Sequence, residues 1–268
     1  MKLYSWEDGI NLIVVFVIVF LVKLFIDRLN HNKVNLAFSI RKFGLFIGIG
    51  IAFIAPLTSM DKVNLLDDLI YLGASSVMII VAIFLSMIIN DKLLLRHVNN
   101  NKMLSENNLS VAFVEIGTFI ATGIILFASM SGEGVWWTSV LFFILGQISF
   151  ILLVFLYNVI TKFNIHDLVK EGNISVAIVL SGIMISAAII LKTAIMGDDT
   201  TLVNDLKLFG IDLVIVVVFV IIVLNNVIDK IFLPKVRVYD EIVKDNIPIA
   251  ITYSSIKIAL AFVISSII

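Results

Sequence analysis

The repeating element of this chain is the stretch EGNISVA at residues 171–177, followed by an apolar run from Ile178 to Leu191. Three other stretches resemble it: NLSVA at 108–112, NIPIA at 246–250 and, more loosely, KVNLA at 33–37. Eleven positions after the last alanine of each copy stands a small residue; these are Gly48, Gly123, Ala188 and Ala261. Four copies in one register indicate an internal repeat.

The composition is that of an integral membrane protein. Of the 268 residues, 60% are hydrophobic and the mean hydropathy is +1.12, whereas soluble proteins are about 45–50% apolar. The net charge of -1 gives no basic surface for nucleic acid. The chain has no cysteine, and His31, His97 and His166 fall in predicted loops away from any cluster of carboxylates. The sequence therefore predicts neither a metal site nor a cofactor.

Eight apolar runs are long enough to cross a bilayer as helices, since about 20 residues span about 30 Å. They cover residues 10–27, 35–58, 69–89, 109–129, 136–161, 174–196, 208–228 and 247–268. A transmembrane barrel would need strands of alternating polarity, and these runs do not alternate. The predicted fold class is all-α, a polytopic membrane protein with eight transmembrane helices in two parallel four-helix repeats.

Lysine and arginine are concentrated on one side of the predicted membrane. The first, third, fifth and seventh loops, with the first turns that follow them, hold Arg28, Lys33, Arg41, Lys42, Lys92, Arg96, Lys102, Lys162, Lys170, Lys230, Lys235, Arg237 and Lys244. The other side holds only Lys2, Lys62, Lys192 and Lys207. The positive-inside rule then places the odd-numbered loops in the cytoplasm and both termini outside. The N-terminus lacks a basic region and a cleavage pattern, so the first run is expected to remain as an anchor.

The repeat has a second level. The pair Asp91-Lys92 stands twenty-one residues before Ala112, and Asp229-Lys230 stands twenty-one residues before Ala250. Helices three and four therefore align with helices seven and eight, and we predict two four-helix units at 1–133 and 134–268. Because each unit has an even number of helices, the copies keep one orientation and are expected to surround an axis along the membrane normal.

The segment HDLVKEGNISVA at 166–177, continuing through Gly182 and Ala188, resembles the signature of the YjfL-like family of uncharacterised bacterial inner-membrane proteins. The resemblance covers essentially the whole chain as two units, with Lys33 in place of the motif asparagine in the first copy. It implies four helices per unit and a bacterial inner membrane. Members are often encoded near envelope-stress and membrane-remodelling proteins, but the family has no established activity. No catalytic residue can therefore be carried over.

The motif asparagines Asn108, Asn173 and Asn246 stand where an amphipathic elbow turns into a membrane helix. Asparagine at this position can cap a helix by accepting a bond from a backbone N–H that has no partner within the helix. The alternative function is a ring of side-chain amides that lines a cytoplasmic vestibule.

Small residues lie on the even-numbered predicted helices. Gly44 and Gly48 form a GxxxG motif, and Gly123, Ala188 and Ala261 continue a small-residue stripe on the equivalent helices. Such residues let helix backbones approach closely in lipid. We therefore predict that the even-numbered helices form the packed centre, with a pore lining as the alternative.

Charges inside the membrane are candidate functional residues, because burying them is costly. Lys257 lies about 15 Å deep and Glu115 about 9 Å deep from the same side, by the helical rise. We predict that the two form an ion pair across the axis between the units. This pair would be structural or part of an ion or proton path, and the third alternative is that the two never meet.

Other charges lie nearer to the predicted membrane surfaces. Asp212 is a secondary intramembrane charge, about one turn inside the outer end of helix seven. Lys23, Arg41 and Lys42 lie within about two turns of the cytoplasmic boundary, so their side chains are expected to extend to that surface.

No phosphate-binding loop, nucleophile elbow or HExxH motif is present, so an enzyme is not expected. The favoured function is that of a non-enzymatic envelope component that organises membrane or recruits a cytosolic partner through its elbows. The alternative is a small ion or solute channel or transporter with its path between the two repeats. The lipid bilayer is the expected environment, while a protein partner and self-association are both left open.

Overall fold

The computed structural model describes residues 6–29, 35–59, 64–95, 99–132, 136–161, 164–196, 201–222 and 237–267, and all regular structure among them is helical. The long helices are α1 (Trp6–Leu29), α2 (Leu36–Thr58), α3 (Leu65–Leu93), α5 (Leu109–Met130), α6 (Trp136–Ile160), α8 (Ile174–Ile195), α9 (Leu202–Ile222) and α12 (Ile247–Ser265). Three short helices precede α5, α8 and α12 respectively: α4 (Asn100–Ser105), α7 (Ile165–Lys170) and α11 (Val238–Val243). The predicted all-α membrane fold is confirmed.

Seven of the long helices are long and apolar enough to cross a membrane, judged on the described residues. They are the counterparts of the first six predicted runs and of the eighth. The remaining run, predicted at 208–228, corresponds to α9, and its second part lies outside the described residues.

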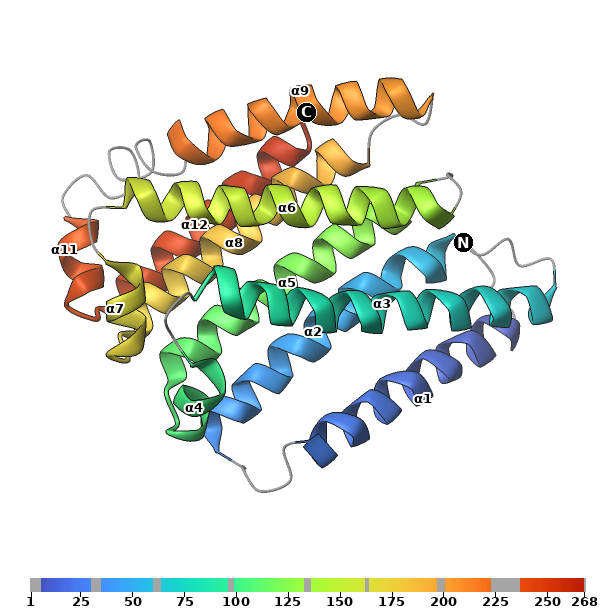
Figure 1. The fold of residues 1–268 in the computed structure, drawn as a ribbon, viewed down its shortest axis with the longest axis horizontal. Helices are drawn as coiled ribbons and strands as arrows, with labels where there is room; N and C mark the ends of the chain where they lie inside the picture. Colours follow the sequence, from blue (N-terminus) through green and yellow to red (C-terminus); the bar gives the residue numbers. More distant parts are fainter. Residues whose placement is uncertain are drawn as a thin grey trace.

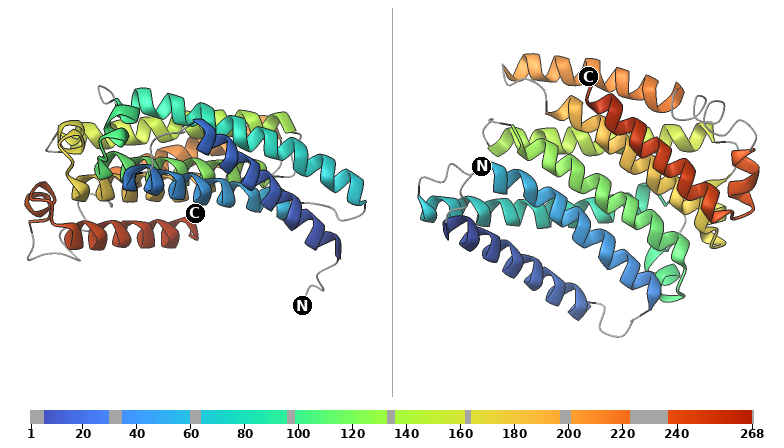
Figure 2. Two further views of the ribbon diagram at one scale, coloured as in Figure 1. Left: turned by 90° about the horizontal axis from the view of Figure 1, so that it is seen from below. Right: turned by 180° about the vertical axis from the view of Figure 1, so that it is seen from behind.

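Four helices lie side by side in one row, in the order α2, α5, α8, α12 (Figures 1 and 2). These are the helices that follow the four copies of the repeat motif. The helices α3, α6 and α9 cover one face of the row, and α1 lies beside α2 and α3 at one edge. Within the row, α5 and α8 are the most buried helices and form the packed centre, whereas α2 and α12 lie at its two edges.

Glycines bring neighbouring helices of the row into close contact. A Cβ on Gly44 would lie 2.7 Å from the Cα of Ile116, and one on Gly117 would lie 2.6 Å from the Cα of Ser181. A Cβ on Gly182 would lie 2.5 Å from the Cβ of Ser254. Each distance is too short for a real side chain, so close approach of these helices depends on glycine.

These contacts define a common register. Gly44, Gly117 and Gly182 each stand nine residues after the cap asparagine of their own helix, and each faces the residue eight positions after the next cap. In the first copy this register counts from Asn35, whose side chain accepts from the N–H of Phe38. The alignment that placed Lys33 at this position is thus wrong by two residues. The physical reason is that a lysine side chain has no acceptor with which to cap a helix.

Each short helix forms an elbow with the long helix that follows it. One residue in the left-handed backbone region joins the two: Asn107 with a φ of 63°, Gly172 with 91° and Asp245 with 62°. Glycine adopts this conformation freely, and asparagine and aspartate adopt it more readily than other residues. The three elbows lie at the same end of the row (Figure 1).

Candidate functional site

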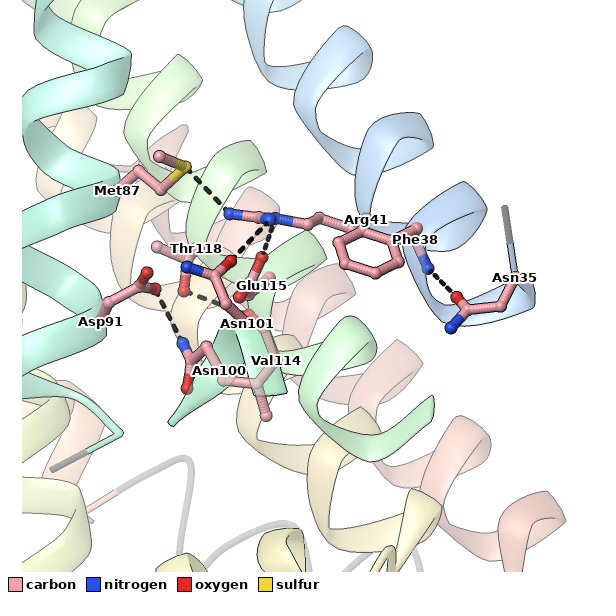
Figure 3. Close-up of polar contacts among 10 residues, drawn as sticks. All are labelled: Asn35, Phe38, Arg41, Met87, Asp91, Asn100, Asn101, Val114, Glu115 and Thr118. Carbon is pink, nitrogen blue, oxygen red and sulfur yellow. Dashed lines mark hydrogen bonds and ion pairs between the residues drawn. The ribbon is translucent and has the colours of Figure 1, made fainter. Parts of the chain in front are cut away.

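A buried ion pair lies at the elbow end of the first unit, between α2 and α5 (Figure 3). The Nε of Arg41 lies 2.5 Å from Oε2 of Glu115, and the two side chains are 12% and 4% exposed. An Nη2 hydrogen of Arg41 also points to the sulfur of Met87 on α3, with an N–S distance of 3.1 Å. Arg41 thus joins three helices.

The elbow helix α4 completes this cluster. Asn100 donates its amide to Asp91 on α3 at 2.8 Å, and the Nη1 of Arg41 donates to Asn101 at 3.4 Å. Figure 3 shows both asparagines beside the carboxylates of Asp91 and Glu115. We call Arg41, Asp91, Asn100, Asn101 and Glu115 the elbow cluster.

The elbow cluster carries more negative than positive formal charge. It has the carboxylates of Asp91 and Glu115 but only the guanidinium of Arg41. Among the described residues, Oε1 of Glu115 and Oδ1 of Asn100 are buried acceptors without a hydrogen-bond partner. Leaving buried acceptors of this kind unpaired costs free energy, so the elbow cluster is a polar site inside an apolar helix bundle.

The ion pair of the elbow cluster is not repeated in the second unit. Counting 138 residues on from Arg41, Asn100 and Glu115 gives Val179, Val238 and Tyr253, all buried. The counterpart of Asp91 is Asp229, which lies outside the described residues. The pairing of Arg41 with Glu115 is therefore specific to the first unit.

Lys257 lies apart from the elbow cluster. Its side chain is fully buried, and its Nζ lies 4.0 Å from the ring centre of Tyr253 and 5.4 Å from that of Tyr157. Aromatic faces attract cations, so the rings stabilise the ammonium group.

The predicted pair between Glu115 and Lys257 needs correction. The ion-pair partner of Glu115 is Arg41, and α8 lies between α5 and α12 (Figure 2). The physical reason is the row: small residues join each repeat helix to the next, so equivalent helices of the two units do not face one another across an axis.

The sequence reasoning missed Arg41, Asp91 and Asn100 as site residues. Arg41 was expected to extend to the cytoplasmic surface, yet its guanidinium is turned inward to Glu115. The positions of the two residues along their helices could have indicated this pair. Arg41 stands six residues after its cap and Glu115 seven, which places both about 10 Å from the helix starts on adjacent helices.

The cap asparagines use both ends of the side-chain amide. The side-chain oxygens of Asn108, Asn173 and Asn246 accept from the N–H three residues later, as in a helix cap. The amides of two of them donate forward to the next elbow: Asn108 to the carbonyl of Lys170 at 3.2 Å, and Asn173 to that of Val243 at 3.0 Å. The amides of Asn108 and Asn173 therefore bind backbone carbonyls of the following elbow.

Asn35 repeats this forward contact, since its amide donates to the carbonyl of Leu104 at 2.6 Å. The elbows also bind back. Asn107 accepts from the N–H of Ala37 at 3.0 Å, and Asp245 accepts from the N–H of Ser175 at 2.7 Å. Each elbow is thereby fastened to the helix start of the preceding repeat.

Asn246 differs from the other cap asparagines. Its amide donates to Glu241 in its own elbow at 2.8 Å. This hydrogen bond, together with that from Lys244, lowers the pKa of the Glu241 carboxyl.

The remaining predicted site residues are placed as follows. Gly48 and Gly123 lie where α2 and α5 cross, and a Cβ on Gly123 would overlap the carbonyl of Gly48. Ala188 and Ala261 are fully buried in α8 and α12. Asp212 is partly buried on α9 and does not belong to the elbow cluster.

Comparison with known proteins identifies the family. The family described as Domain of Unknown Function (DUF350) matches residues 8–130 and again 132–268. The chain is 25% identical to a "UPF0719 transmembrane protein" of Aquifex aeolicus (strain VF5) over 258 residues, which are 93% of this chain and 92% of that protein. No solved structure is significantly similar. Because the two matches cover nearly all of the sequence, the chain belongs to the DUF350 family, as two tandem copies of its domain.

Proposed function

We propose that this protein is a non-enzymatic component of the bacterial inner membrane that presents its elbows as a platform for a protein partner. Both termini lie outside, and the elbows face the cytoplasm. The observation that carries this proposal is the set of hydrogen bonds from Asn35, Asn108 and Asn173 to the elbow that follows each of them. Elbows held in fixed positions suit a docking surface better than elbows that move independently would.

The chemistry of the elbows supports recruitment. Their outward side chains carry both signs of charge: Lys102 and Arg237 are 69% and 91% exposed, and Glu106 and Asp240 are 54% and 55% exposed. Exposed residues of mixed charge steer the approach of a charged partner and add specificity. The resemblance to YjfL-like proteins supports the bacterial inner membrane and an envelope role.

Site-specific photo-crosslinking in cells tests this proposal. A photoreactive residue at Lys102, Lys170 or Lys244 is expected to give discrete protein adducts. The matched control is Phe155, an exposed apolar residue of α6, which is expected to give lipid adducts only.

The elbow adducts should weaken in Asn108→Ala and Asn173→Ala, which remove the amides that fix the elbows. Crosslinks from the elbows to lipid alone, at the same yield as from Phe155, would overturn the recruiting role.

A second candidate function is permeation of a cation or proton. The elbow cluster favours it, because the buried charges of Arg41 and Glu115 have the uncharged counterparts Val179 and Tyr253 in the second unit. Intramembrane ionisable groups often mark ion paths. Flux in liposomes distinguishes the two functions, comparing the native chain with Glu115→Gln and Lys257→Met.

For these flux measurements Lys23→Met is the control, since Lys23 is half exposed and lies outside the elbow cluster. Flux that Glu115→Gln abolishes and Lys23→Met leaves unchanged would establish permeation. Absence of flux across several cations and pH gradients would support the platform.

A further inference from the structure

The row contains one contact made three times. At each junction, a small residue nine positions after one cap faces the residue eight positions after the next cap. The pairs are Gly44 with Ile116, Gly117 with Ser181, and Gly182 with Ser254. The two unmatched positions in this series are Ser255 on α12 and Phe43 on α2.

The outer face of α12 continues the series. Ser255 and Ala259 stand nine and thirteen residues after Asn246 and are exposed in the structure. Their counterparts on α8, Gly182 and Ser186, are buried. On either side of them Ile251 and Phe262 are 52% and 59% exposed. The face of α12 that corresponds to the α12-facing side of α8 is thus exposed.

The outer face of α2 is the complementary surface. Phe43 is 63% exposed, and a Cβ on Gly50 would meet nothing within 4 Å. Gly50 stands fifteen residues after its cap, and the residues at this position on the other row helices are Gly123, Ala188 and Ala261, all buried. On α5, α8 and α12 this face packs against the preceding helix of the row. On α2, the first helix of the row, the same face is exposed.

The hydrogen bonds at the elbows follow the same pattern. The amides of Asn35, Asn108 and Asn173 donate to the following elbow, whereas that of Asn246 turns back to Glu241. Among the described residues, Asn246 therefore makes the cap without the forward contact.

We propose that a second copy of this chain binds with its α2 against the outer face of α12, so that the row continues from one molecule into the next. Ser255 and Ala259 of one copy meet Phe43 and Gly50 of the other. Two different surfaces are joined, so the interface is heterologous, and it gives a ring if the rotation closes and an open chain otherwise. This assembly does not depend on what binds the elbows.

A second copy fits these faces better than lipid does. Apolar exposure alone is ordinary at a lipid boundary. Here the two open faces are the two halves of a junction that the chain already makes, at matching depths and in the same direction. Small residues let helices approach closely, and van der Waals contact between helices is the main source of their association in lipid.

Cysteine crosslinking tests the proposal, because the chain has no native cysteine to interfere. Ser255→Cys and Phe43→Cys are made in separate chains, purified, and reconstituted together in liposomes under oxidising conditions. Both sites are exposed, so the variants are expected to fold. The mixture should give a covalent dimer, because a disulfide needs Cβ atoms about 3.5–4.5 Å apart and the proposed junction brings them near that distance.

The controls separate this interface from others. Each variant reconstituted alone should give no dimer, and Ser255→Cys mixed with Phe155→Cys measures random collision. Dimers of Ser255→Cys with itself, at the yield of the mixture, would mean that α12 pairs with α12 and would overturn the proposal. A mixture that does not exceed the collision control would overturn it too.

A second measurement uses the mass of the assembly in lipid nanodiscs. The native chain should exceed the 29.8 kDa of one protomer. Ser255→Trp should reduce it to one protomer, since the indole prevents close approach. Ile144→Trp, on the exposed side of α6, should leave the mass unchanged. A native chain of one protomer at every protein-to-lipid ratio would contradict the proposal.

Discussion

Arg41 and Glu115 illustrate how a charge pair inside a membrane depends on its partner. Neither side chain reaches much solvent, so each must be neutralised where it lies. Removing one member of a buried pair costs about 3–5 kcal/mol, because it leaves an uncompensated charge, whereas replacing both with apolar groups is often neutral. The pair therefore contributes specificity more than stability.

We expect Arg41→Met to lower the free energy of unfolding by about 3–5 kcal/mol, since Glu115 then lacks its cation. Glu115→Gln should cost less, because the carboxylate of Asp91 faces the same guanidinium. The double variant should recover most of the loss. Equilibrium unfolding in detergent by circular dichroism measures all three.

The control for this cycle is Lys257→Met combined with Glu115→Gln. Because Lys257 lies against Tyr253 and Tyr157 and not against Glu115, these two losses should add. Residues without shared partners are normally additive within about 0.5 kcal/mol. Additive losses for Arg41 with Glu115 would show that the pair does not exist in the folded protein.

At the residue scale the sequence placed Glu115 along its helix but did not identify its partner. The helical rise placed Glu115 about 9 Å from the cytoplasmic end. Its partner depends on which helices are adjacent, and that information was in the spacing of Gly44, Gly117 and Gly182 from their caps. Counting the first copy from Lys33 instead of Asn35 gave Gly44 a different spacing from its cap, so the common position of the three glycines was not visible.

At the scale of elements, the cap asparagines do more than begin helices. Asn173 supplies an acceptor to its own helix and two donor contacts to the carbonyls of Ile242 and Val243. The acceptor orders α8, whereas the donors connect α8 to α11. The two roles can be separated by substitution.

Asn173→Asp keeps the acceptor and removes the donors, while Asn173→Ala removes both. We expect both variants to speed hydrogen exchange in α11, and only the alanine to speed it also in the first turn of α8, by about 1 kcal/mol of lost capping. Asn164→Ala, which affects a cap within one elbow, is the control and should leave α11 unchanged. Equal exchange in α11 for the native chain and Asn173→Asp would refute the forward contact.

At Gly172 a substitution is expected to raise the free energy of unfolding. Its counterparts Asn107 and Asp245 use their side chains to accept from helix starts of the preceding repeat. Gly172→Asn should supply the same acceptor and raise the unfolding free energy by up to about 1 kcal/mol, since one hydrogen bond contributes about that much. Gly172→Val should lower it, because a β-branched residue is strained at a φ of 91°. Thermal unfolding of both variants checks the sign.

Because glycines bring the helices of the row into close contact, a larger side chain at such a glycine is expected to destabilise the protein. Gly117→Leu should destabilise by about 1–3 kcal/mol or more, because its side chain would overlap the backbone of α8 at Ser181. Gly73→Ala on α3 is the control: nothing lies within 4 Å of its Cβ, and alanine in a helix is about 0.5–1 kcal/mol better than glycine. Equal stability of the two variants would contradict the row.

The bounds of the long helices were easier to predict than the contacts between residues or the arrangement of the whole molecule. Apolar runs gave the long helices to within a few residues, because the hydrocarbon thickness sets their length. The capping positions Asn108, Asn173 and Asn246 followed from asparagine and its acceptor, whereas the first cap is Asn35 and not Lys33. What could not be predicted was the forward contact of the amides, since it joins residues about 60 to 70 positions apart and has no local pattern.

At the scale of the whole molecule, the row replaces the expected axis between two units. A sequence repeat predicts that equivalent helices make equivalent contacts. It does not predict whether those contacts arrange the helices around a common axis or in an open row. The open line results here because the two contact faces of each row helix point in different directions, one toward the preceding helix and one toward the next. An open line leaves one face at each edge.

The orientation of the row in the membrane is the last prediction, and it concerns every element at once. Lysine and arginine place the elbows in the cytoplasm, so single cysteines at Lys102, Lys170 and Lys244 should resist a membrane-impermeant maleimide in intact cells and react after permeabilisation. Cysteines at Ser59, Ser131 and Thr201, at the opposite end, should react in intact cells. The native chain, which has no cysteine, is the unlabelled control. The reverse labelling pattern would place the elbows outside, where no cytosolic partner could reach them, and would overturn the proposed platform while leaving the fold unchanged.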